Sequence, residues 1–111
     1  MLLDVPSARM TLMEAKGRLP MGEYELWYRR IGEGPRPPLL LLHGGPGAGS
    51  DYLESFEDLA ADREVIFYDQ LGCGRSDKPD DDELWRIERF ADEIATVRKH
   101  LGLGEIHLLG Q

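Results

Sequence analysis

The chain has 111 residues, the common size of a single domain, with 13 Lys and Arg against 21 Asp and Glu, a formal net charge of −8. That acidity argues against nucleic acid and against an anionic membrane surface as partners, because both need a basic protein face. One cysteine, no visible secretory signal and no apolar run of about 18 residues argue against an internal disulfide, a multi-cysteine zinc site and a membrane span. A cytoplasmic globular protein is therefore expected.

The first third of the sequence predicts an antiparallel pair of strands. Residues 23–31 are rich in aromatic side chains and roughly alternate, which is typical of a half-buried strand. Residues 10–19 are a weaker strand candidate, and a turn at residues 20–22 would join the two. The Gly- and Pro-rich residues 32–38 then predict a loop.

Three short apolar runs predict buried parallel strands, at residues 39–42, 64–69 and 106–109. Between the first two, apolar side chains at helical spacing predict a helix from Asp51, with Glu54 completing a capping box. The order β-β-β-α-β-α-β predicts an α/β fold, with a mostly parallel sheet, flanking helices and a leading hairpin.

A long helix before the last strand is the clearest prediction. Its apolar stripe is Leu84, Ile87, Phe90, Ala91, Ile94, Val97 and Leu101. Acidic residues 80–83 precede it and basic residues 98–100 end it, as the helix dipole favours. Gly102 then stands where many helices end in left-handed backbone.

Two glycine loops follow predicted strand ends, the edge at which α/β sheets bind ligands. They are residues 43–49 (HGGPGAG) and 71–76 (LGCGRS). Glycines there let backbone N–H groups approach an oxyanion or a phosphate, although a tight turn without chemistry fits equally well. A dinucleotide site is disfavoured, because G-x-G-x-x-G and the P-loop pattern are absent and Pro46 lacks an N–H donor.

Both loops and the last strand resemble the proline iminopeptidase family of α/β-hydrolases, which includes the tricorn-interacting aminopeptidase and L-amino-acid amidases. The resemblance rests on residues 39–47 (LLLLHGGPG), 68–77 (YDQLGCGRSD) and 106–111 (IHLLGQ), in the family's order and separation. It covers the chain from about Tyr24 to the end. Related epoxide hydrolases and haloalkane dehalogenases usually carry H-G-x-P without the Gly-Gly-Pro-Gly run.

This resemblance implies the α/β-hydrolase fold, with residues 1–111 forming the N-terminal part of a single domain. It implies that the Gly45 backbone N–H is an oxyanion-hole donor and that Gly44 and Gly45 contact the substrate. The residues that would shape the two loops around this donor are His43, Pro46, Gly47, Asp69, Gln70, Gly72, Cys73 and Gly74.

The resemblance also implies that the nucleophilic serine follows Gln111, because Gly110 and Gln111 supply the first two letters of G-x-S-x-G. The triad and the substrate-selecting cap would then lie in a C-terminal remainder, contiguous or a separate chain, and residues 1–111 alone would be inactive. Two observations independent of the resemblance also predict that residues 1–111 are part of a larger domain. The last strand would expose an apolar edge, and α/β domains commonly run to about 200–250 residues.

The expected function is a serine hydrolase that releases an N-terminal amino acid, with proline favoured, from peptides or amino-acid amides. The alternatives are an esterase, lactonase or epoxide hydrolase of the same fold, or a non-catalytic fragment that acts only with a partner chain. No cofactor, metal, nucleic acid or membrane is implied.

Some single residues have two interpretations. Asp69 and Cys73 lie where catalytic groups occur, but we expect Asp69 to organise its loop and Cys73 to be a small loop residue. The three histidines lie on separate elements, which disfavours a metal cluster. Arg75 either locks the second loop, with Asp77 the nearest carboxylate in sequence, or forms a surface ion pair worth little.

Overall fold

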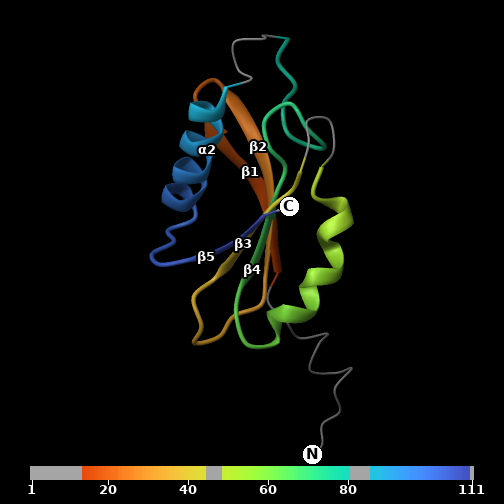
Figure 1. Cartoon of the computed structure of the whole chain (residues 1–111), viewed down its shortest axis with the longest axis vertical. Coiled ribbons are helices and arrows are strands. Elements are labelled where there is room, and N and C mark those ends of the chain that lie inside the picture. The colour runs from red at the N-terminus through yellow and green to blue at the C-terminus, as the bar shows by residue number, and fades with distance from the viewer. Residues whose placement is uncertain (1–13, 45–48, 81–85, 111) are drawn as a thin grey trace, which may run out of the picture.

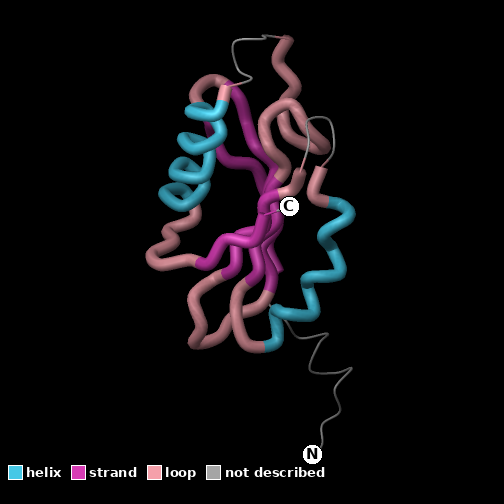
Figure 2. Tube along the Cα trace, viewed as in Figure 1, coloured by secondary structure: helices cyan, strands magenta, loops and turns pink. Residues whose placement is uncertain are grey.

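The computed structural model describes residues 14–44, 49–80 and 86–110. Five strands form one sheet, with a 3₁₀ helix, η1, on one face and the α-helix α2 on the other (Figures 1 and 2). The elements in chain order are β1 (Glu14–Met21), β2 (Tyr24–Ile31), β3 (Leu39–Leu42), η1 (Asp51–Ala61), β4 (Val65–Tyr68), α2 (Ile87–His100) and β5 (His107–Gly110). In the described part of the chain, no helix is long and apolar enough to cross a membrane.

The leading hairpin is present, but its turn begins two residues later than predicted. β1 pairs antiparallel with β2, Met21 opposite Tyr24, so the turn falls at residues 22–23. Gly22 takes a positive φ of 62°, which a two-residue hairpin turn favours. Pro20 belongs to β1 rather than to the turn, because β1 is an edge strand where a missing N–H is tolerated.

The sheet is mixed, in the order β1-β2-β4-β3-β5. β3 pairs parallel with both β4 and β5, as predicted, whereas β2 joins β4 antiparallel. The parallel register places Leu40 opposite Ile66 on one side and Leu108 on the other. The three strands that carry the glycine loops and the C-terminus therefore run in the same direction.

The leucine run of β3 is buried on both faces, as predicted. Leu40 packs with Ile66, Tyr68 and Val97 in the core cluster beneath α2. On the other face, Leu39 and Leu41 pack in a second cluster with Ala60 of η1 and with Phe67. Alternating side chains along a four-residue strand thus hold both layers of the fold.

The helix at residues 51–61 differs from the prediction in type and in cap. It is a 3₁₀ helix whose N-cap is Ser50, and no side-chain hydrogen bond caps it. A capping box that starts at Asp51 is therefore wrong in position, and the Asp51 and Glu54 side chains lie outside the described part. Ser50 uses its polar groups elsewhere, on Asp69.

α2 ends as predicted, and the C-terminal half of its predicted stripe faces the core, with Val97 buried and Ile94 and Leu101 packed against the same cluster. Gly102 has a φ of 66°, and the N–H groups of Gly102 and Leu103 donate to the carbonyls of Lys99 and Arg98, a Schellman motif. The buried positions are Arg89, Glu93 and Val97, each four residues apart, whereas Ile87 of the predicted stripe is 84% exposed. Leu84 and acidic residues 81–83 lie outside the described residues.

β5 is exposed rather than buried. It pairs with β3 at the edge of the sheet, and Leu108 and Leu109 are 52% and 38% exposed. The predicted apolar edge is therefore present, and the interpretation of residues 106–109 as a buried strand is wrong within this chain.

Candidate active site

Two loops leave the sheet side by side, because β3 and β4 are parallel neighbours. Leu41 pairs with Phe67, so the first loop begins after Leu42 and the second after Tyr68 at the same edge. Gly110 of β5 pairs with Leu42, which brings the end of β5 to that edge as well. The parallel register thus brings together the three segments on which the family resemblance rests.

His43 and Gln70 join the starts of the two loops. His43 is 3% exposed, and its Nε2 accepts a hydrogen bond of 2.9 Å from the Gln70 N–H. The Gln70 side-chain amide donates to the His43 carbonyl at 2.7 Å. Because Nε2 is an acceptor, the ring proton is assigned to Nδ1, which lies 3.2 Å from the Gly44 carbonyl. Both ring nitrogens are therefore engaged in holding backbone.

Asp69 joins the far ends of the same loops. Its carboxylate is fully buried, and Oδ1 accepts hydrogen bonds from the N–H and the hydroxyl of Ser50, both at 2.7 Å. Oδ2 accepts from the Arg75 N–H at 2.8 Å and from Arg75 Nε at 3.1 Å. Burial alone would raise the pKa of Asp69, but the hydrogen bonds from Arg75 and Ser50 outweigh it and lower the pKa. Asp69 is thus an ionised, fully engaged carboxylate, the arrangement expected of an organising residue.

Two glycines make room for this carboxylate. Gly74 has a φ of 51°, and a Cβ there would lie inside the contact distance of Asp69 Oδ2. A Cβ on Gly49 would lie 3.2 Å from Asp69 Oδ1 and 3.1 Å from the Gly74 Cα. Each loop therefore contributes a glycine that lets the backbone close around Asp69.

Replacing Gly74 by alanine is expected to destabilise the folded protein by about 2–4 kcal/mol, through left-handed strain plus the collision with Asp69. Gly102→Ala is the matched control, because Gly102 also has a positive φ but nothing lies within 4 Å of an added Cβ. The control is expected to cost only about 1 kcal/mol. Urea unfolding of both variants measures the difference, and equal losses would contradict the packing of Gly74 against Asp69.

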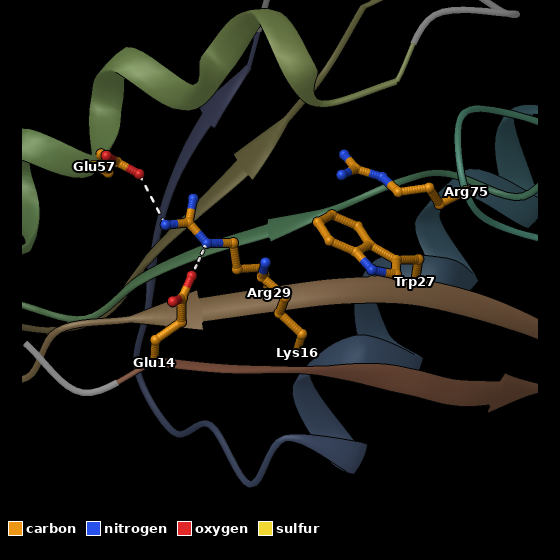
Figure 3. Close-up of a pocket in the computed structure, with 6 residues that line it drawn as sticks. All are labelled: Glu14, Lys16, Trp27, Arg29, Glu57 and Arg75. Carbon is orange, nitrogen blue, oxygen red and sulfur yellow. Dashed lines mark hydrogen bonds and ion pairs between the residues drawn. The ribbon is translucent and has the colours of Figure 1, made fainter.

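Arg75 locks the second loop, but through Asp69 rather than Asp77. Its guanidinium lies over the Trp27 ring, 3.5 Å from the centroid, as Figure 3 shows. Asp77 instead accepts a hydrogen bond of 2.8 Å from Arg18 Nη2 and one of 2.8 Å from the Glu25 N–H. Proximity in sequence indicated the wrong carboxylate because the loop turns between the two residues and points Asp77 toward the hairpin.

The hydrogen bonds of Asp69 with Ser50 and Arg75 form a network, the Asp69 network. Ser76 and Trp27 also belong to it, and the sequence patterns did not single them out. The Ser76 hydroxyl donates to the Asp69 carbonyl and accepts from the Trp27 N–H at 2.8 Å. The Asp69 N–H donates to the Trp27 carbonyl at 3.0 Å. Ser50 was missed too. One feature of the sequence could have indicated both serines: Ser50 directly follows the first glycine loop, and Ser76 is the last residue of the second.

Cys73 lies inside the turn of the second loop and is 1% exposed. Its N–H donates to the Gln70 carbonyl at 2.9 Å, and its carbonyl accepts from the Ser76 N–H at 3.1 Å. Gly72 has a φ of 88° and donates to the Asp77 carbonyl at 2.7 Å. Gly45, Pro46 and Gly47, which include the expected oxyanion donor, lie outside the described residues, and so does Gln111.

A polar pocket of about 200 Å³ lies beside this network (Figure 3). Arg29 crosses it between two carboxylates, hydrogen-bonded to Glu14 and, at 2.8 Å, to Glu57. Burial alone would lower the pKa of Arg29, but these hydrogen bonds outweigh it and raise the pKa. The residues that line the pocket are Glu14, Lys16, Trp27, Arg29, Glu57 and Arg75. The positive charge of Arg29 in this pocket is therefore balanced by the carboxylates of Glu14 and Glu57.

Comparisons with known proteins agree with this architecture. The family model described as the alpha/beta hydrolase fold matches residues 37–111. Proline iminopeptidases of Lactiplantibacillus plantarum and Clostridium botulinum are each 50% identical, over 97 and 99 residues, which cover 84% and 86% of this chain and 34% of each relative. The chain therefore spans about a third of the length of these curated relatives.

A solved structure gives the same result. The crystal structure of a proline iminopeptidase from Mycobacterium smegmatis superposes with a TM-score of 0.81 at 36% identity, covering 87% of this chain and 35% of that one. The resemblance to the proline iminopeptidases is thus confirmed in sequence and in fold. The chain belongs to the α/β-hydrolase fold family.

Proposed function

We propose that this chain supplies the oxyanion-hole loop of a serine hydrolase that releases an N-terminal amino acid, with proline favoured, from peptides or amino-acid amides. The observation that carries the proposal is the pairing of Gly110 with Leu42, which places the end of β5 beside the start of the H-G-G-P-G loop. A nucleophile directly after Gln111 would therefore stand next to the backbone donors of that loop. The identity to two proline iminopeptidases supports the choice of substrate.

In this proposal the residues of the chain act on the reaction through backbone. The Gly45 N–H is the first oxyanion donor, and the N–H of the residue after the nucleophile is the second. Gly44 and Gly45 contact the substrate. His43 and Gln70 hold the start of the loop, and the Asp69 network holds its end.

The proton transfers belong to residues outside this chain. The serine after Gln111 attacks the scissile carbonyl, while a histidine takes the serine proton and later gives it to the leaving amine. We propose that both lie in a C-terminal remainder that completes the same domain. The 34% coverage of the relatives supports a longer enzyme, and the exposed β5 edge supports a sheet that continues. The 111 residues alone are then expected to be inactive.

Substrate competition tests this function in the complete enzyme, the chain together with its remainder. We expect prolyl-p-nitroanilide to be hydrolysed with a kcat/KM at least tenfold above those for p-nitrophenyl acetate and styrene oxide. An N-acetylated prolyl anilide is the matched control, and it is expected to be a poor substrate because a free N-terminus is needed. Hydrolysis of the ester or the epoxide alone would contradict the aminopeptidase proposal.

A further inference from the structure

A buried ion pair lies on the face of α2 that meets the sheet. Arg89 is 7% exposed and Glu93 is fully buried, and Arg89 Nη1 donates a hydrogen bond to Glu93 Oε2. Helical spacing predicted apolar side chains for the buried face of this helix. Removing two charges from water is costly, and apolar residues of similar volume are often as stable or more so. Burial of this pair is therefore not explained by packing energy alone.

Glu93 reaches from the helix to the second loop. Its Oε2 also accepts a hydrogen bond of 3.2 Å from the Leu71 N–H. Leu71 directly follows Gln70, whose N–H and side-chain amide both bind His43. A single carboxylate oxygen on α2 thus holds the peptide next to the one that fixes His43.

The other carboxylate oxygen is not satisfied in the same way. Glu93 Oε1 is buried and has no hydrogen-bond partner among the described residues. Burial raises the pKa of Glu93, although the hydrogen bond from Leu71, the charge and hydrogen bond of Arg89 and the Tyr68 hydroxyl oppose the shift. Glu93 therefore contacts the second loop through Oε2, and burial of its carboxylate costs free energy.

We infer that Glu93 is a positioning residue, which holds the Leu71 peptide and thereby sets the Gln70–His43 pair at the start of the oxyanion loop. The effect on catalysis rests on the function proposed above, whereas the effect on the Gln70–His43 pair does not. If the Leu71 peptide moves, the two Gln70 hydrogen bonds to His43 lengthen and the Gly44 backbone shifts with the His43 carbonyl. Misplacement of a catalytic group by about 1 Å can cost about a hundredfold in rate.

Three variants of the complete enzyme separate positioning from stability. Glu93→Leu alone leaves Arg89 buried without this carboxylate and is expected to fold poorly. The double variant Arg89→Met/Glu93→Leu replaces the pair with apolar side chains and is expected to be more stable than Glu93→Leu, but to unfold at a lower urea concentration than the wild type because the Leu71 N–H loses its acceptor. Glu93→Gln keeps an oxygen that accepts from Leu71. Asp92→Leu, at an exposed position of the same helix, is the matched control.

The readouts are kcat, KM, the amide exchange rate of Leu71 and the ring nitrogen chemical shifts of His43. In the double variant we expect exchange at Leu71 to rise about tenfold and kcat to fall at least about tenfold, with KM little changed. Glu93→Gln and Asp92→Leu are expected to stay within about twofold of the wild-type kcat.

Wild-type exchange and wild-type kcat in the folded double variant would overturn the inference, because the pair would then be structural only. Faster exchange at Leu71 and altered His43 shifts with an unchanged kcat would support the positioning of His43. The same result would refute the proposed catalytic role of the first loop. Failure of the positioning inference and failure of the proposed function are therefore distinguishable.

Discussion

Replacing Gly45 by proline in the complete enzyme is expected to lower kcat by about 10²–10³-fold, the usual cost of losing one oxyanion-hole donor. Proline removes the N–H itself, whereas Gly45→Val keeps the N–H and places a β-branched side chain where the substrate carbonyl would approach. Both variants are expected to abolish useful turnover of prolyl-p-nitroanilide. Stopped assays with saturating substrate measure the loss directly in kcat.

The expectation depends on the fold surviving the change. Gly45 lies in the segment between two anchored points, His43 on Gln70 and Ser50 on Asp69, so the fold is expected to remain. Gly104→Val is the matched control, because Gly104 is exposed and nothing lies within 4 Å of an added Cβ. An unchanged kcat in Gly45→Pro, with the control also unchanged, would refute the assignment of Gly45.

Replacing Asp69 by asparagine is expected to destabilise the complete enzyme by about 3–5 kcal/mol, the usual range when one partner of a buried charged network is removed. All four hydrogen bonds to this carboxylate come from donors, on Ser50 and Arg75. An asparagine side chain has one accepting oxygen and one NH₂ group. The NH₂ group would point at the donors of either Ser50 or Arg75, so two hydrogen bonds are lost and donors oppose donors there. Urea unfolding measures the loss.

Asp77→Asn is the matched control for this variant. Asp77 also receives hydrogen bonds from an arginine and from a peptide N–H, but the Arg18 and Asp77 side chains are 37% and 40% exposed. A solvent-exposed ion pair contributes about 1 kcal/mol or less. If Asp69→Asn cost no more than Asp77→Asn, Asp69 would not be the residue that joins the two loops.

The lowered pKa of Asp69 also predicts that the free energy of unfolding falls at acidic pH. The Asp69 pKa is lowered in the folded protein, so the unfolded chain binds the proton more readily. The stabilisation is therefore complete above the unfolded pKa of about 3.9 and is lost as the pH falls through the lower folded pKa. We expect the difference in unfolding free energy between wild type and Asp69→Asn to be constant from pH 7 to 5. It is then expected to shrink below pH 4, and a difference that grows toward acid would contradict the pKa direction.

Much of the fold was predictable because its signals are local. The leucines of β3 and the apolar run of β4 are short and bounded by loops, which left buried strands as the simplest interpretation. Gly102 marked the end of α2 because a left-handed residue there satisfies the last carbonyls. The alternation of strands and helices then gave the parallel part of the sheet without further information.

The errors arose where partners distant in sequence decide the outcome. The buried face of α2 is set by Tyr68 and Leu71 across the core, and helical periodicity carries no information about an ion pair on that face. Arg75 binds Asp69 rather than Asp77, because the fold of the second loop decides which carboxylate the arginine meets. β5 is exposed because it pairs with one neighbour, whereas its composition is that of a buried strand.

We propose that the chain places its H-G-G-P-G loop beside a nucleophilic serine that follows Gln111. Labelling the complete enzyme with a fluorophosphonate and mapping the adduct by mass spectrometry tests this claim most directly. We predict one adduct per molecule, on a serine directly after Gln111, with labelling slowed by a prolyl amide substrate. No adduct, or an adduct on a residue elsewhere in the sequence, would contradict the account.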